Sequence, residues 1–305
     1  MQGASHITVT FFRWSDLVEA MGKVAVVTDS TAYLEPGVAQ QLDITVVPLN
    51  VHLGDETLRD GIDLTPEEFF RRVEEQNGLI PRTSPPSVRT FEQVYANLHS
   101  HTDQILSIHI SGQLSQTIYH ARRGAESLLG RCNIMVLDSL TTSLGLGILA
   151  KAAGEAAQGG ATLDEVVRLV RGMIPHIYVV FYVDQMDYLE RGHRVGKAQA
   201  ILGTMLNVKP LLFMEDGEII PLEKVRTHEK AIEKLFEFVA EFSEVEQAAV
   251  VQRHVAPTQE TTMLLERLVQ LFPHVKFPII QYGPVLASHI GPSAMGVIVY
   301  ETPEW

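Results

Sequence analysis

The sequence predicts an α/β fold of two α/β domains, the first with a Rossmann-like parallel sheet and the second with a mixed sheet and helices. In the first half, short β-branched apolar runs alternate with segments of helical periodicity, which is typical of a doubly wound parallel sheet. In the second half, the acidic turn at 215–218 joins two predicted strands and indicates an antiparallel hairpin. A length of 305 residues suits two domains.

The first half is expected to contain strands that alternate with helices. The clearest helix start is at Thr65, where Thr-Pro-Glu-Glu supplies an N-cap, a proline at the first helical position and an acidic first turn. Apolar runs predict strands at 23–30, 44–49, 105–110 and 134–137. Helical spacing of apolar residues predicts helices from 65, over 91–98 and 117–129, and through a small-residue segment ending near 158.

The second half continues with helices and strands in a different arrangement. Helices are expected at 163–174, 228–242 and 259–272, and strands at 177–183, 209–214, after the hairpin turn, 248–252 and 296–300. The glycine pair at 159–160, and the basic loop and hairpin that appear only in the later segment, place the domain boundary near residues 160–176. We therefore expect an extension at 1–22, an N-terminal α/β domain at 23–170 and a C-terminal α/β domain at 171–305.

Composition excludes several classes of protein. With 24 basic and 37 acidic residues the net charge is −13, which argues against a nucleic-acid partner, because binding to the phosphate backbone needs a basic surface. Cys132 is the single cysteine, so no internal disulfide can form, and this fits a reducing compartment. The sequence has no apolar run of about 18 residues and no secretory signal, so we expect a cytoplasmic protein.

Four segments rich in hydroxyl groups follow or flank predicted strands. They cover residues 28–31, 83–87, 111–117 and 138–143. Ligands of open α/β sheets bind beyond the carboxyl ends of the strands, where hydroxyls and helix N-termini can hold an anionic group. Each hydroxyl taken alone is better explained as a helix N-cap, but four such segments at one sheet edge favour a site for an oxyanion.

A fifth polar segment, 288–294, contains His289 among glycine and proline. One alternative is a hydrolase of acyl esters, with a serine as nucleophile, His289 as base and Asp29 or Asp138 as its partner, although the G-x-S-x-G elbow is absent. A small-metabolite sensor or a protein-binding module is a third possibility. The Gly145-x-Gly147 pattern matches part of a dinucleotide fingerprint, but it lies too far from its strand and indicates close helix packing instead.

Considered together, these segments resemble the DegV family. The matching motifs are K-V-A-V-V-T-D-S-T from residue 23, R-T-S-P-P-S from 82, I-H-I-S-G-Q-L-S-Q-T from 108, V-L-D-S from 136, Y-L-E-R-G-H-R from 188, N-V-K-P-L-L from 207, K-V-R from 224 and S-H-I-G-P-S-A-M-G from 288. The resemblance covers about residues 23–301, and the motifs are specific jointly rather than singly.

The resemblance implies a fatty acid binding protein of the EDD fold, with the carboxylate in the interdomain cleft and the acyl chain buried in the second domain. It also implies a lipid-carrying subunit of a bacterial fatty acid kinase, which presents the carboxyl group to a separate ATP-binding subunit and is not itself an enzyme. The expected ligand is a long-chain acid such as palmitate, stearate or oleate, with no cofactor and no metal. No stable membrane insertion is expected, only transient contact.

The resemblance also implies roles for individual residues. The head-group ligands by motif position are Thr83, Ser84, Ser111, Ser115 and His289, with Thr117, Gly291 and Asp29 as secondary candidates. Arg226 and Arg194 are the candidates for docking the partner. The chain departs from the usual family pattern at Gly112, Gln116 and Ser293, so the head-group geometry is expected to be a variant one.

Overall fold

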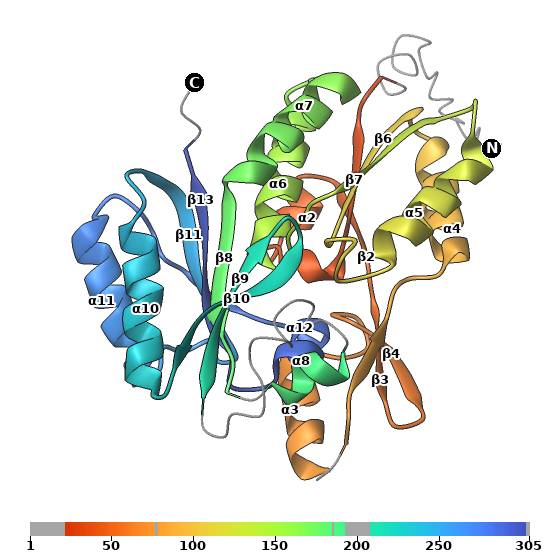
Figure 1. The fold of residues 1–305 in the computed structure, drawn as a ribbon. Helices are drawn as coiled ribbons and strands as arrows, with labels where there is room; N and C mark the ends of the chain where they lie inside the picture. The colour runs from red at the N-terminus through yellow and green to blue at the C-terminus, as the bar shows by residue number, and fades with distance from the viewer. Residues whose placement is uncertain (1–21, 77–78, 185, 193–207, 303–305) are drawn as a thin grey trace, which may run out of the picture.

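The computed structural model describes residues 22–76, 79–184, 186–192 and 208–302, and Figure 1 shows their arrangement. The strands are β1 (Ala25–Asp29), β2 (Ile44–Val47), β3 (Asn50–Leu53), β4 (Glu56–Arg59), β5 (Arg82–Ser84), β6 (Gln104–His109), β7 (Asn133–Asp138), β8 (Ile177–Tyr182), β9 (Lys209–Glu215), β10 (Glu218–Val225), β11 (Val245–Gln252), β12 (Ile279–Gln281) and β13 (Met295–Glu301). The α-helices are α2 (Val38–Gln41), α3 (Pro66–Glu75), α4 (Val88–His99), α5 (Thr117–Ala125), α6 (Leu144–Gln158), α7 (Leu163–Met173), α8 (Asp187–Arg191), α10 (His228–Ala240), α11 (Gln259–Leu271) and α12 (Pro284–Ile290). Short 3-10 turns are η1 (Ser30–Ala32), η2 (Glu126–Leu128) and η3 (Ile174–His176).

The first sheet is parallel, as predicted, with strand order β2-β1-β6-β7. Its strands are apolar on both sides because helices cover both faces. Buried residues of β1 and β6 pack with α6 and α7 on one face, and Val27 and Ile105 pack with Phe91 and Tyr95 of α4 on the other. Because the strands are parallel, the carboxyl ends of β1, β6 and β7, with their polar segments, lie at a single edge of the sheet.

The second sheet is mixed, with strand order β10-β9-β8-β13-β11-β12. The predicted hairpin is present: Asp216 and Gly217 both have positive φ, of 50° and 82°, and β9 pairs with β10 in antiparallel fashion. Strand β8 alternates strictly, because Val180 and Tyr182 pack with α10 and α11 while Val179 and Phe181 face the opposite side. That opposite side faces α12 and the first half of the chain.

A third, antiparallel sheet of order β4-β3-β5 was not predicted. The prediction missed it because its strands have only three or four residues each, too short for a clear alternating pattern. Val51 of β3 and Phe69 and Phe70 of α3 belong to the same apolar core as Phe181 and Ile298 of the mixed sheet. A division of the chain at residue 170 stays a prediction.

Two segments differ from the sequence prediction. The 83–87 segment begins within β5 of the small antiparallel sheet, where Thr83 and Ser84 pair with β3, so only three of the four hydroxyl-rich segments lie at the edge of the parallel sheet. The sequence predicts a loop over 288–294, but residues 288–290 belong to helix α12, which begins at Pro284. Seven residues between glycines are too few for a periodic signal, so the helix could not be seen in the sequence.

Candidate ligand-binding site

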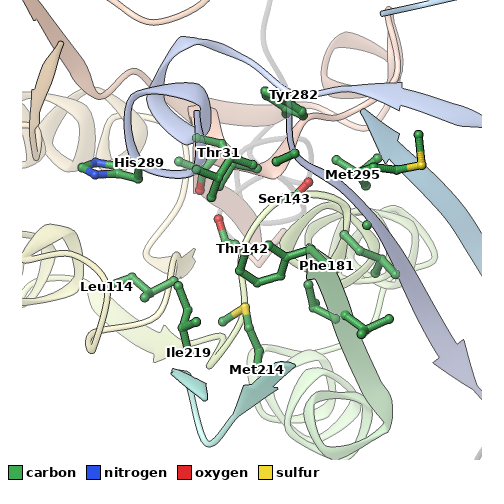
Figure 2. A pocket seen from close by; sticks show the side chains of 18 of the residues that line it. Thr31, Leu114, Thr142, Ser143, Phe181, Met214, Ile219, Tyr282, His289 and Met295 are labelled. Atoms are coloured by element: carbon green, nitrogen blue, oxygen red, sulfur yellow. The ribbon is translucent and has the colours of Figure 1, made fainter. Parts of the chain in front are cut away.

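An apolar cavity lies between the carboxyl edge of the parallel sheet and the mixed sheet (Figure 2). Its free space is about 70 Å³, and it reaches about 750 Å³ only when the adjoining space that opens to solvent is included. Strands β8 and β13 provide one wall, Met214 and Ile219 of the hairpin a second, and α12 a third. The cavity therefore suits a ligand that is mostly hydrocarbon.

His289 lies where this cavity meets the surface. Its Nε2 atom is 2.7 Å from the Thr83 hydroxyl oxygen, although the two residues are 206 positions apart in the chain. Helix α12 ends just after His289 at Gly291, whose φ is 79°. A Cβ atom on Gly291 would lie 2.8 Å from the ring of Tyr188, so glycine is needed for this close approach. The Thr83 and His289 pair provides hydrogen-bonding groups at one end of an apolar space.

Ser84 and Ser115 both line a surface hollow next to this pair. The hollow is lined by 83–85 on one side and by 112–116 on the other, and Leu114 separates it from the cavity. Ser115 Oγ lies 2.8 Å from the Thr117 hydroxyl, and Ser84 Oγ lies 2.9 Å from His52 Nε2. The structure therefore brings Thr83, Ser84, Ser115 and His289 together at the mouth.

Ser111 occupies a different position. It is completely buried, donates from Oγ to the carbonyl of Gly217 at 2.8 Å, and accepts from the backbone N–H of Gln113 at 3.2 Å. A Cβ atom on Gly217 would lie 2.4 Å from Ser111 Oγ, so the hairpin turn approaches this serine closely. Ser111 thus ties the 111–117 segment to the β9–β10 hairpin.

The secondary candidates are buried groups with protein partners. Asp29 accepts from the Thr31 hydroxyl at 2.6 Å and from the Ile110 N–H at 2.9 Å, and it lies 3.0 Å from His109 Nδ1. Thr117 is fully buried beneath Ser115, and the carbonyl of Gly291 accepts from the Tyr282 hydroxyl at 3.0 Å.

The carboxylates of the hydrolase hypothesis are both engaged in bonds that hold the fold. Asp29 bonds with His109 in the core of the first sheet, and Asp138 accepts from the backbone N–H groups of Gly112 and Leu140. The N-cap explanation is correct for some hydroxyls of these segments, because Ser87 caps α4 by accepting from the Thr90 N–H. No observation here favours a hydrolase.

Basic side chains border the mouth. Arg82 and Arg191 line a second hollow that also contains Thr83 and His289, and both are exposed. Sequence reasoning missed Arg82, although it directly precedes Thr83. Arg226 is exposed after β10, whereas Arg194 lies outside the described residues.

A buried carboxyl supports the helix that carries His289. Asp60 is 3% exposed, and burial raises its pKa to about 7. The negative charge of Asp29 also raises it, while hydrogen bonds from the Ser30 side chain and from the Val285 N–H act in the opposite direction. Because Val285 lies in the first turn of α12, Asp60 accepts from the N-terminus of that helix.

Two other features are absent from the described ranges. No three His, Cys, Asp or Glu side chains are grouped there as metal ligands would be. Among the helices of residues 22–302, apart from the segments that the structure does not describe, none has the length and apolar character needed to cross a membrane.

Comparison with known proteins identifies the family. The model of the family described as "Uncharacterised protein, DegV family" matches residues 23–302. The chain belongs to the DegV family. A DegV domain-containing protein of Streptomyces coelicolor is 36% identical over 278 residues, which are 90% of this chain and 98% of the relative.

Solved DegV structures share the fold. A DegV family protein of Thermus thermophilus, described as binding fatty acid, has a TM-score of 0.81 and 33% identity, with 92% of this chain and 100% of that one covered. Bacillus subtilis DegV, described as a fatty acid binding protein, has a TM-score of 0.82 and 32% identity, with 92% and 99% covered. The predicted family and fold class are confirmed.

Proposed function

We propose that this DegV chain is a carrier of long-chain fatty acids, which holds the acyl chain in the apolar cavity and the carboxylate at the mouth. One observation carries the proposal: the apolar cavity has the hydrogen-bonding pair Thr83 and His289 at its surface end. Burial of an alkyl chain contributes about 0.8 kcal/mol per CH₂, so the chain dominates affinity. The fatty acid binding described for the Thermus and Bacillus relatives supports the same conclusion.

Each mouth residue has a role in this proposal. Thr83, Ser115 and His289 hydrogen-bond the carboxylate, and Ser84 borders it. Neutral donors can replace the water that a carboxylate loses on partial burial, so no buried salt bridge is required. Ser111 acts by holding the 111–117 segment against Gly217, and Thr117 supports Ser115 in the same way.

The first experiment is identification of the ligand. Denaturing mass spectrometry of the purified protein should release about one equivalent of a saturated or monounsaturated fatty acid such as palmitate, stearate or oleate. Repeated preparations without lipid that also fail to take up palmitate or oleate would contradict the proposal.

A second experiment tests the head-group residues. Stearate and its methyl ester share a chain, but only the acid presents a carboxylate. We expect Thr83→Val and His289→Gln each to weaken stearate binding about tenfold to a hundredfold, as loss of one hydrogen bond to a charged group does, with the ester unaffected. His99→Gln, at the C-terminal end of α4 and outside the lining of the cavity, is the matched control. Equal losses of affinity for the acid and the ester would show that these residues do not recognise the carboxylate.

The carrier is further proposed to present its carboxylate to the ATP-binding subunit of a fatty acid kinase, in the cytoplasm. The head group at a surface hollow edged by Arg82 and Arg191 supports presentation to a partner, and exposed Arg226 is the proposed docking residue. Lipid-loaded protein, ATP and such a subunit should give an acyl phosphate that hydroxylamine traps. Arg226→Ala should reduce its formation while stearate affinity is unchanged, and absence of product with wild-type protein would refute the kinase role.

A further inference from the structure

Two hydroxyl groups in the cavity have no hydrogen-bond partner among the residues that the structure describes. Thr142 and Ser143 line the cavity and are 5% and 2% exposed. Among the described residues, Thr142 Oγ1 and Ser143 Oγ are buried side-chain oxygens without a protein partner. Buried hydroxyls are nearly always paired, because an unpaired one loses its hydrogen bonds to water without compensation. Two adjacent exceptions in one cavity therefore require an explanation.

The local backbone directs one of these hydroxyls away from its usual role. Ser143 is the N-cap residue of the 15-residue helix α6, yet its side chain makes no capping hydrogen bond. Serine is among the preferred N-cap residues because its oxygen can accept from the first turn of the helix. Here Ser143 has φ of 57°, a conformation that is uncommon for any residue except glycine. The chain holds Ser143 in this conformation with its hydroxyl unused by the helix.

The surroundings of the two hydroxyls are polar on one side only. Figure 2 shows Thr31, Thr142 and Ser143 grouped in one part of the cavity, whereas the labelled residues Phe181, Met214 and Ile219 present carbon and sulfur. The Thr31 hydroxyl donates to Asp29, so it faces its neighbours as an acceptor only. A ligand hydroxyl in this place could donate to one of these oxygens and accept from another.

We propose that Thr142 and Ser143 form a polar subsite for a hydroxyl group carried on the buried part of an acyl chain, so that hydroxy fatty acids are among the ligands. This inference rests on the proposed function, and it adds a second recognition point inside the cavity, apart from the carboxylate at the mouth. In a uniformly apolar pocket a chain hydroxyl would lose its water and weaken binding. A hydroxyl that reaches the subsite forms hydrogen bonds there in place of those to water, so a hydroxyl at that one position along the chain does not weaken binding.

The test compares stearate with a set of stearates that carry a single hydroxyl at different carbons, each displacing a fluorescent fatty acid from the full-length protein. We expect one isomer to bind at least as tightly as stearate, while the others bind about tenfold more weakly. In the Thr142→Val/Ser143→Ala double variant the favoured isomer should lose about tenfold, and stearate should change less than twofold.

Matched variants separate recognition from folding. Thr28→Val removes another buried, unpartnered hydroxyl that does not line the cavity, and it should leave the preference among isomers unchanged. Thr142→Ser keeps the hydroxyl and should keep the preference. If the double variant fails to fold, the nearly isosteric Thr142→Val alone carries the test.

The outcomes distinguish this inference from the proposed function. If stearate binds and all hydroxy isomers bind equally weakly to both proteins, the subsite is refuted and the fatty acid carrier is not. An ordered water would then be the partner of the two hydroxyls. If stearate itself does not bind, the proposed function is refuted and this inference with it. If one isomer is favoured but binds the double variant with unchanged affinity, other residues recognise its hydroxyl and the proposed subsite is refuted.

Discussion

Asp60 offers the sharpest test of how the site is held together. Its carboxyl is buried beneath α12, and its pKa is raised from 3.8 to about 7, mainly by loss of water. In the unfolded chain the same group has its ordinary pKa. Between about pH 4 and pH 7 the folded protein therefore keeps a proton that the unfolded chain has lost, so the free energy of unfolding falls as pH rises through this range.

The expected magnitude follows from the two pKa values. The difference between 3.8 and about 7 is about three pH units, which corresponds to about 4 kcal/mol of stability present below pH 4 and lost by about pH 7.5. Asp60→Asn has no proton to lose and keeps an oxygen that can accept from Val285. The variant should therefore match the wild-type protein near pH 4 and be more stable by up to about 4 kcal/mol at pH 8.

Urea unfolding of both proteins at intervals from pH 4 to pH 8 measures this difference directly. Asp63, three residues away, gives a control of opposite sign: its pKa is lowered to about 2, mainly by a hydrogen bond from Arg59. Asp63→Asn should therefore be less stable than wild type by the same amount from pH 4 to pH 8, and this difference should shrink only as pH falls below about 4. A stability difference between Asp60→Asn and wild type that is the same at pH 4 and pH 8 would refute the assignment of a raised pKa to Asp60.

Three further predictions concern the packing and the cavity. Ser111→Ala should lower the free energy of unfolding by about 1–3 kcal/mol, since the Gly217 carbonyl loses its donor, whereas Ser100→Ala at an exposed helix end should change it by less than about 0.5 kcal/mol. Gly147→Ala should cost about 1–3 kcal/mol in thermal unfolding, because its Cβ would lie 2.4 Å from the Ala32 carbonyl; an unchanged melting temperature would show that α6 can shift. Fatty acid affinity, measured by displacement, should rise about fourfold for each added CH₂ until the cavity is filled, and a flat response would contradict burial of the chain.

The glycines of α6 illustrate what a local pattern can and cannot predict. For Gly145-x-Gly147 the sequence predicts close helix packing rather than a dinucleotide fingerprint, and the structure confirms it: Cβ atoms there would lie 2.5 Å from the Thr141 hydroxyl and 2.4 Å from the Ala32 carbonyl. Small residues on a helix indicate that another segment of the chain packs closely against it. They do not say what approaches, since Ala32 is more than a hundred positions away in the chain.

The sequence by itself determined the family, the parallel and mixed sheets, most helix boundaries and the residues now placed at the mouth. These depend on local signals: β-branched runs, the capping residue Thr65, the turn at Gly217 and ordered motifs. The tertiary structure alone decided which hydroxyls are available. Ser111, Ser115 and Ser143 look alike in the sequence, yet one binds a hairpin carbonyl, one borders the mouth, and one faces the cavity unpaired. The reason is physical: a hydroxyl bonds whichever group lies within about 3 Å, and that group is set by packing between distant segments.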